Sequence, residues 1–237
     1  MADFTRRSAI GAASVGAAGL TLSAVSSAAA QGVPAPVPAF AGNHQPRPLK
    51  FDPAKLTGLS EKLITSHWQN NYQGSVKGPN TIEQKLAAAM ADKDFAAPIY
   101  SGLTREELDR TGSVVLHEYY FDNMTPGGSP MPSSGKLLDA INSSFGSLDL
   151  FRADFKPVAT MRGVGWAIAF QDPTTKSISN HWVTLHNDGN PAGYKPILIM
   201  DAWEHAFVPD YKPTERGKYV EAYLQNIDWK AVEGRAL

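Results

Sequence analysis

The sequence predicts an α+β fold, in which an N-terminal α-helical hairpin is followed by a C-terminal domain with a three-stranded antiparallel sheet and helices. Apolar residues recur three and four positions apart at about 59–76 and again at about 104–124, which predicts the two helices of the hairpin. Short apolar runs follow at 165–170, 182–186 and 197–200 and predict the strands. Helices that precede strands along the chain are typical of α+β proteins.

Composition limits the kinds of site that the chain can form. Its 237 residues are enough for a sizeable core, and a net charge of −1 does not favour nucleic acid as a partner. Because the chain has no cysteine, disulfides, thiolate metal ligands and cysteine nucleophiles are excluded. A metal site would therefore use Asp, Glu and the six histidines.

Residues 1–30 are expected to be a secretory signal peptide of the twin-arginine type. Arg6 and Arg7 precede a stretch of small and apolar residues, and Ala28–Ala30 are suitable for cleavage. The stretch is too weakly apolar to predict a membrane span. We therefore expect a periplasmic or secreted protein that has no membrane association after the signal is removed. An ordinary secretory signal that happens to contain two arginines is the alternative.

The rest of the chain divides by composition. Residues 31–50 are rich in proline and predict an extended, partly disordered linker without a core, in which His44 is exposed to solvent. A helical-hairpin domain over 51–128 and a C-terminal α/β domain over 129–237 are expected to follow.

Local signals predict where the helices begin and end. Lys77-Gly78-Pro79 predicts the end of the first helix, with a separate helical piece over 80–90. Thr104 and Glu107 have the spacing of a capping box, which places the start of the second long helix at Thr104. Shorter helices are expected at 135–142 and 148–159, and a closing helix at 214–229.

Candidate metal ligands lie at the end of the third predicted strand. Asp201 and His205 are four residues apart, so a helical turn after the strand would place both side chains on one face. A carboxylate and an imidazole in this arrangement form half of a transition-metal site, although such a pair is more often simply a surface pair. His67 and His117 each occupy one face of a hairpin helix, which favours a site between the helices.

The chain from about Leu49 onwards resembles the iron/manganese superoxide dismutase family. Asp201-Ala-Trp-Glu-His205-Ala-Phe is similar to the family's signature around its last two metal ligands. Five further segments occur in the family's order and spacing: 117–123 (His-Glu-Tyr-Tyr-Phe-Asp-Asn), Gly127-Gly128, Ser144–Ser147, Gly163–Trp166 and Ile227–Trp229.

The resemblance implies a function and a ligand set. It implies that His67, His117, Asp201 and His205 bind one iron or manganese ion per subunit, with solvent at a fifth position. Three imidazoles and one carboxylate suit either metal. Superoxide would be converted to O₂ and H₂O₂ while the metal alternates between two oxidation states. The resemblance also implies a homodimer, in which Glu204 reaches the partner's ligand histidine.

Several residues near the implied site depart from the family pattern. Ser75 and Val208 stand where the family usually has tyrosine, and Asn71 stands where it usually has histidine. These departures leave open a metal-binding protein with weak or lost dismutase activity, or a different metal-dependent oxidation.

Five more side chains are interpreted with the help of the resemblance. His186 is interpreted as the donor to the solvent ligand in place of the usual glutamine, with a surface histidine as the alternative. Trp166, together with Trp203 and Phe121, is interpreted as an aromatic wall around the metal, although ordinary core packing is equally compatible. Arg216 is either a cation near the substrate channel or an exposed loop residue.

Overall fold

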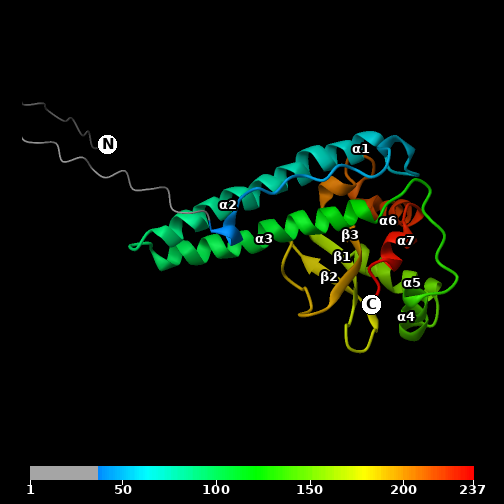
Figure 1. Ribbon diagram of the computed structural model, residues 1–237. Helices are drawn as coiled ribbons and strands as arrows, with labels where there is room; N and C mark the ends of the chain where they lie inside the picture. The colour runs from blue at the N-terminus through cyan, green and yellow to red at the C-terminus, as the bar shows by residue number, and fades with distance from the viewer. Residues whose placement is uncertain (1–36) are drawn as a thin grey trace, which may run out of the picture. The chain divides into compact units, whose positions relative to one another are not determined.

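The computed structural model describes residues 37–237, so the predicted signal peptide over 1–30 lies outside the described residues. The helical hairpin and the sheet of the predicted α+β fold are both present (Figure 1). The hairpin consists of α1 (Glu61–Ser66), a π-helical turn (His67–Tyr72), α2 (Gln73–Ala91) and α3 (Ala97–Asp122). Ser60 caps α1, since its side chain accepts a hydrogen bond from the backbone N–H of Leu63.

The predicted break at Lys77-Gly78-Pro79 is wrong, because α2 continues through Pro79 to Ala91. Proline costs a helix one hydrogen bond and a steric contact with the preceding turn. That cost is offset because α2 packs along α3, and Val76, Pro79 and Leu86 of α2 are buried. Tertiary packing has overridden the local signal.

The predicted start of the second long helix at Thr104 is also wrong. The helix α3 already begins at Ala97, with Pro98 in its first turn, where a missing N–H has no cost. Thr104 therefore lies inside the helix, and its hydroxyl donates a hydrogen bond to the carbonyl of Tyr100 at 3.1 Å. A capping-box spacing indicates a helix start only when no stronger signal precedes it.

Residues 42–50 of the predicted linker are held against the hairpin by charged contacts. His44 is exposed, as expected, but its Nε2 lies 2.5 Å from the carboxylate of Glu83 on α2. Two ion pairs follow to α3, from Arg47 to Glu118 at 3.1 Å and from Lys50 to Asp122 at 2.8 Å. The expectation of a partly disordered stretch is wrong for these residues, which run along the hairpin (Figure 1), because the side chains of His44, Arg47 and Lys50 tie them to the two helices.

The sheet has the strand order β2-β1-β3, and both neighbouring pairs are antiparallel. The strands are β1 (Gly165–Gln171), β2 (Ile178–Thr184) and β3 (Lys195–Asp201). All of β1 is buried, as expected for the central strand. The second strand lies earlier than the predicted 182–186, since the polar residues Ser179, Asn180 and His181 also pair with β1.

The remaining helices cover the sheet. α5 (Leu148–Ala159) packs on β1 and β2, and α4 (Lys136–Phe145) packs on β2, while α3 packs against β3. The predicted closing helix is divided into α6 (Arg216–Gln225) and α7 (Trp229–Glu233). The division follows from Asn226, whose side chain hydrogen-bonds the backbone of Thr57 and of Gly127 and ends α6 there. Four short 3-10 turns complete the described fold: Pro38–Phe40, Pro53–Lys55, Glu204–Ala206 and Pro213–Glu215.

Within residues 37–237, no helix combines the length and apolar character needed to cross a membrane.

Candidate metal centre

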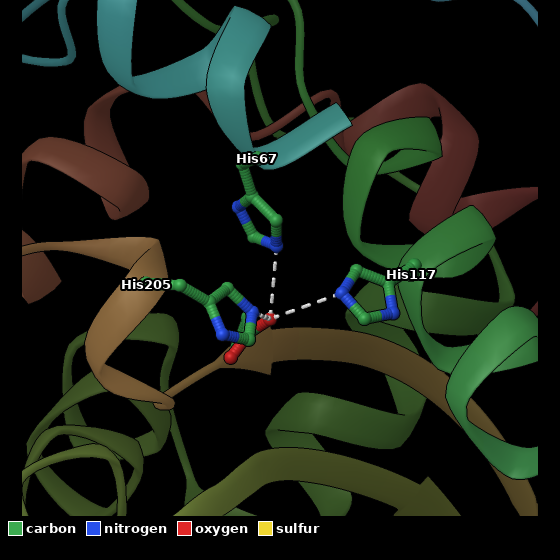
Figure 2. A group of neighbouring side chains, drawn as sticks. His67, His117 and His205 are labelled. Carbon is green, nitrogen blue, oxygen red and sulfur yellow. Dashed lines mark hydrogen bonds and ion pairs between the residues drawn. The ribbon is translucent and has the colours of Figure 1, made fainter. Parts of the chain in front are cut away.

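Four side chains from distant parts of the sequence converge at the junction of the hairpin and the sheet. His67 begins the π-helical turn, His117 lies on α3, Asp201 ends β3, and His205 lies in the 3-10 turn that follows. Their candidate ligand atoms all lie within 4.8 Å of one another. The side chains of His67, His117 and Asp201 are at most 2% exposed, and that of His205 is 25% exposed. Figure 2 shows the three imidazoles around the carboxylate.

The distances at this cluster fit a shared metal ion. Asp201 Oδ2 lies 3.1 Å from His67 Nε2, 3.1 Å from His205 Nε2 and 3.6 Å from His117 Nε2. Two ligands that are each about 2.1 Å from one ion, at angles of 90–120°, are about 3.0–3.6 Å apart. The Nε2 atoms of His67 and His117 are buried without a hydrogen-bond partner among the described residues. Buried polar atoms need partners, so this donor set fits a cation.

Backbone and side-chain contacts fix the orientation of Asp201. Its Oδ1 accepts a hydrogen bond from the backbone N–H of Trp203 at 2.8 Å, which leaves Oδ2 for the cluster. Its carbonyl oxygen accepts a hydrogen bond from the hydroxyl of Tyr219 at 2.7 Å. A 3-10 turn, and not the α-helical turn expected from the sequence, brings His205 back beside the carboxylate. The four-residue spacing therefore does bring both side chains to the cluster, but through a turn that is tighter than an α-helical turn.

His117 is held in one tautomer by its own helix. Its Nδ1 lies 2.7 Å from the carbonyl oxygen of Ser113. Because a carbonyl can only accept, Nδ1 carries the proton and donates it, and Nε2 presents its lone pair to the cluster. This arrangement is that of a histidine ligand oriented by a backbone acceptor.

Burial and neighbouring side chains set the protonation states that metal binding requires. Burial lowers the pKa of His67, and burial together with the nearby His67 lowers the pKa of His117 to about 3. Burial alone would raise the pKa of Asp201, but attraction and hydrogen bonds from His205 and His67 outweigh it, so this pKa lies well below its usual range. At neutral pH the cluster thus contains a carboxylate and buried imidazoles that are neutral, which are the ligand forms.

Aromatic rings enclose the cluster. The ring centroid of His67 lies 5.0 Å from that of Tyr120 and 5.1 Å from that of Phe121. The His117 ring lies 5.0 Å from Trp166, whose side chain is fully buried. Rings at these distances exclude water from that side and lower the local dielectric constant.

His186 lies beside the cluster, in the turn that follows β2 and not in a strand. The indole Nε1–H of Trp166 donates a hydrogen bond to its Nδ1 at 3.1 Å. Since an indole can only donate, the neutral ring carries its proton on Nε2. The ring stacks on Trp203 with centroids 4.9 Å apart, and it lies 6.4 Å from the His117 ring.

Two further predicted residues lie at the edge of the site. Glu204 is exposed, next to His205. Arg216 is held between backbone segments: it donates hydrogen bonds to the carbonyls of Met161 at 2.5 Å and Gly163 at 3.2 Å, and also to that of Ala202. Arg216 thus braces the backbone beside Asp201, and it is neither a free cation in the channel nor an exposed loop residue.

A pocket of about 400 Å³ opens beside the metal cluster. Ser75 and Asn71 line it, whereas Val208 lies outside it and is 48% exposed. Sequence reasoning missed Arg110 in its wall, although Arg110 precedes His117 by two helical turns and so shares its face. The full lining is Asn70, Asn71, Gly74, Ser75, Gly78, Arg110, Ser113, His117, His186, Trp203 and His205.

Comparison with known proteins identifies the family. Residues 133–235 match the family model for the C-terminal domain of iron/manganese superoxide dismutases. An iron superoxide dismutase of Cupriavidus metallidurans is 41% identical over 197 residues, which cover 81% of this chain and 95% of the relative. The chain belongs to the iron/manganese superoxide dismutase family.

Other relatives differ in the metal that they are named for. A manganese superoxide dismutase of Haloarcula marismortui is 35% identical over 190 residues, covering 79% of this chain and 90% of the relative. An iron superoxide dismutase of Aquifex pyrophilus is 35% identical over 187 residues, covering 77% and 86%. This protein is accordingly a superoxide dismutase that uses iron or manganese, and its donor set serves both metals.

Proposed function

We propose that His67, His117, Asp201 and His205 hold one iron or manganese ion per subunit. The observation that supports this proposal is the convergence of three imidazole nitrogens on a single buried carboxylate oxygen. Three neutral ligands and one anionic ligand leave the bound cation with net positive charge, which suits an anionic substrate. Metal analysis of the purified protein together with a superoxide assay, run with peroxide and with cyanide to distinguish the metals, tests the proposal.

The bound metal supplies one-electron redox chemistry, by which one superoxide leaves as O₂ and a second, with two protons, leaves as H₂O₂. The protein contributes an oriented ligand set and a site enclosed by rings. The backbone acceptor at Ser113 fixes the His117 ring, and the N–H of Trp203 fixes the carboxylate. Trp166 forms part of the aromatic wall and also orients His186.

A second candidate is a metal-binding protein with weak dismutase activity or a different metal-dependent oxidation. It is favoured by one observation, namely that the hydroxyl of Ser75 is engaged with that of Ser113 at 2.8 Å beside an open pocket. A turnover far below that of the relatives in the superoxide assay, despite stoichiometric metal, would support it.

We infer that His186 is a positioning and proton-donating residue for the bound substrate or solvent. Its Nε2–H is the donor that the ring can offer to the pocket it lines. Leucine at this position is expected to leave metal content intact and to lower turnover about tenfold, with a changed pH profile. His181→Leu, in β2 and outside the pocket lining, is the matched control. Unchanged turnover of His186→Leu across pH would exclude this role.

We propose that the enzyme is a homodimer in which Glu204 of each subunit contacts the partner's His205. Glu204 is exposed beside that ligand and has no ion pair among residues 37–237. Sedimentation is expected to give a dimer at micromolar concentration, and Glu204→Ala is expected to weaken the dimer. Glu61 is an exposed acidic residue of α1, and Glu61→Ala is the control that is expected to leave the dimer unchanged. A wild-type monomer at that concentration would contradict the proposal.

We also propose export by a twin-arginine-type signal over residues 1–30, which leads to a periplasmic or secreted enzyme. The support is the pair Arg6-Arg7 followed by weakly apolar sequence and Ala28–Ala30. Replacement of both arginines by lysine is expected to retain the full-length precursor in the cytoplasm. Cell fractionation with N-terminal sequencing of the exported form tests this, and unaltered export would instead indicate an ordinary secretory signal.

A further inference from the structure

The pocket beside the metal centre is much larger than superoxide requires. Its volume is about 400 Å³, whereas a water molecule occupies roughly 30 Å³ in the liquid and superoxide has only two atoms. Volumes of a few hundred Å³ are typical of sites that bind small organic molecules. The pocket thus has room for a ligand of a different class.

Small side chains on α2 create this room. Gly74, Ser75 and Gly78 lie in the wall, and a Cβ added at Gly74 would meet no atom within 4 Å. On the α3 side, Ser113 closes the gap between the helices, since its hydroxyl hydrogen-bonds that of Ser75. Two packed helices therefore bound one side of the space, and His186, Trp203 and His205 complete its lining.

Arg110 is the cation in the pocket wall. Its Nε and Nη2 both lie 2.6 Å from Glu106 Oε1, which fixes the guanidinium and leaves Nη1 without a partner among the described residues. Its stem lies over Gly78, where an added Cβ would come within 2.9 Å of the Arg110 Cδ. The negative charge of Asp109 also attracts a proton at His186, so the electrostatic potential at the pocket entrance is not uniformly positive. An anion would therefore be held by direct contact with Arg110 and not by long-range attraction.

Two stacked aromatic rings also line the pocket. The rings of Trp203 and His186 stack at 12° with centroids 4.9 Å apart, and both residues line the pocket. The indole Nε1 of Trp203 is buried and has no hydrogen-bond partner within residues 37–237. A planar ligand ring can pack against an outer face or an edge of this stacked pair.

We propose that this pocket binds small aromatic carboxylates of the size of benzoate. The carboxylate pairs with Arg110, the ring packs beside Trp203 and His186, and the bound molecule blocks the approach of superoxide to His117 and His205. The block on dismutation rests on the proposed metal centre, but binding itself does not.

Sodium benzoate is the probe, and sodium chloride at equal ionic strength is the control for screening. Tryptophan fluorescence of the metal-loaded enzyme reports binding, since Trp203 lines the pocket. Saturable quenching with a Kd on the order of 1 mM is expected, together with competitive inhibition of dismutation. Metal content is measured in every sample, so that loss of activity through loss of metal is distinguished from loss of binding.

Two matched pairs of variants locate the site. Arg110→Gln is expected to raise the benzoate Kd at least about tenfold, whereas Arg105→Gln removes the same charge from α3 outside this pocket and leaves the Kd unchanged. Gly74→Phe fills the pocket and is expected to abolish benzoate quenching. Gly102→Phe is the control, because Gly102 lies on α3 and an added Cβ there would also meet no atom within 4 Å. This variant is expected to keep the benzoate quenching.

Two outcomes would overturn the proposal: no saturable quenching at tens of millimolar benzoate, which is at least about tenfold above the expected Kd, or quenching that persists in both Arg110→Gln and Gly74→Phe. Benzoate binding to a protein that lacks both bound metal and dismutase activity would refute the proposed metal centre while leaving the proposed binding to the pocket intact.

Discussion

Replacement of Asp201 by alanine is expected to give a protein that retains less than roughly a tenth of the wild-type metal and has no measurable dismutase activity. Asp201 supplies the oxygen that all three imidazoles approach, at 3.1, 3.1 and 3.6 Å. It is also the anionic member of the set, so its loss leaves a cation among neutral ligands only. Metal analysis of the purified protein and a superoxide assay measure both effects.

Two control variants show whether the loss of metal and activity comes from the missing ligand charge or from a general effect of removing a carboxylate. Asp201→Asn keeps the shape and an oxygen that can accept from the N–H of Trp203, but removes the charge, so a structured protein with weakened metal binding is expected. Asp149→Ala removes an exposed carboxylate from the first turn of α5 and should leave metal and activity unchanged. Stoichiometric metal in the same place in Asp201→Ala would show that the ligand set is wrong.

Alanine at Gly165 is expected to have the largest effect on the fold. A Cβ at this position would lie 2.2 Å from the carbonyl oxygen of Val183 and 3.0 Å from the Trp182 ring. The β1–β2 pairing would have to open where Gly165 faces Thr184. We expect a loss of about 3 kcal/mol, which is a fall in melting temperature of about 6–12 °C.

Thermal unfolding of the metal-free protein measures this loss without the contribution of bound metal. Gly217→Ala is the control, because Gly217 is exposed in α6 and an added Cβ would meet no atom within 4 Å. That variant should be as stable as the wild type or slightly more so. A melting temperature of Gly165→Ala equal to that of wild type would mean that the two strands are not paired as described.

The sequence alone was enough to predict the order of the elements and the four clustered residues. The strand-like run before Asp201 and the four-residue spacing to His205 are local features, so they could be read without knowing the fold. His67 and His117 are far from them in sequence, and only the resemblance to a family linked all four.

Element boundaries were less predictable from local signals. Pro79 and Thr104 carry strong signals for a break and a start, and both lie inside helices. Burial of the α2–α3 interface, and Pro98 at an earlier helix start, outweighed preferences that are each worth only a few kcal/mol.

By itself, the sequence determined the α+β class, the absence of thiolate chemistry and the donor types available to a metal, because these depend on composition and on short spacings. The tertiary structure alone decided that Arg216 braces the backbone, that Trp166 fixes the tautomer of His186, and that Arg110 faces a pocket beside the ligands. The physical reason is that these roles depend on contacts between groups that are far apart in the sequence. The packing of the chain sets such contacts, and local sequence preferences do not predict them.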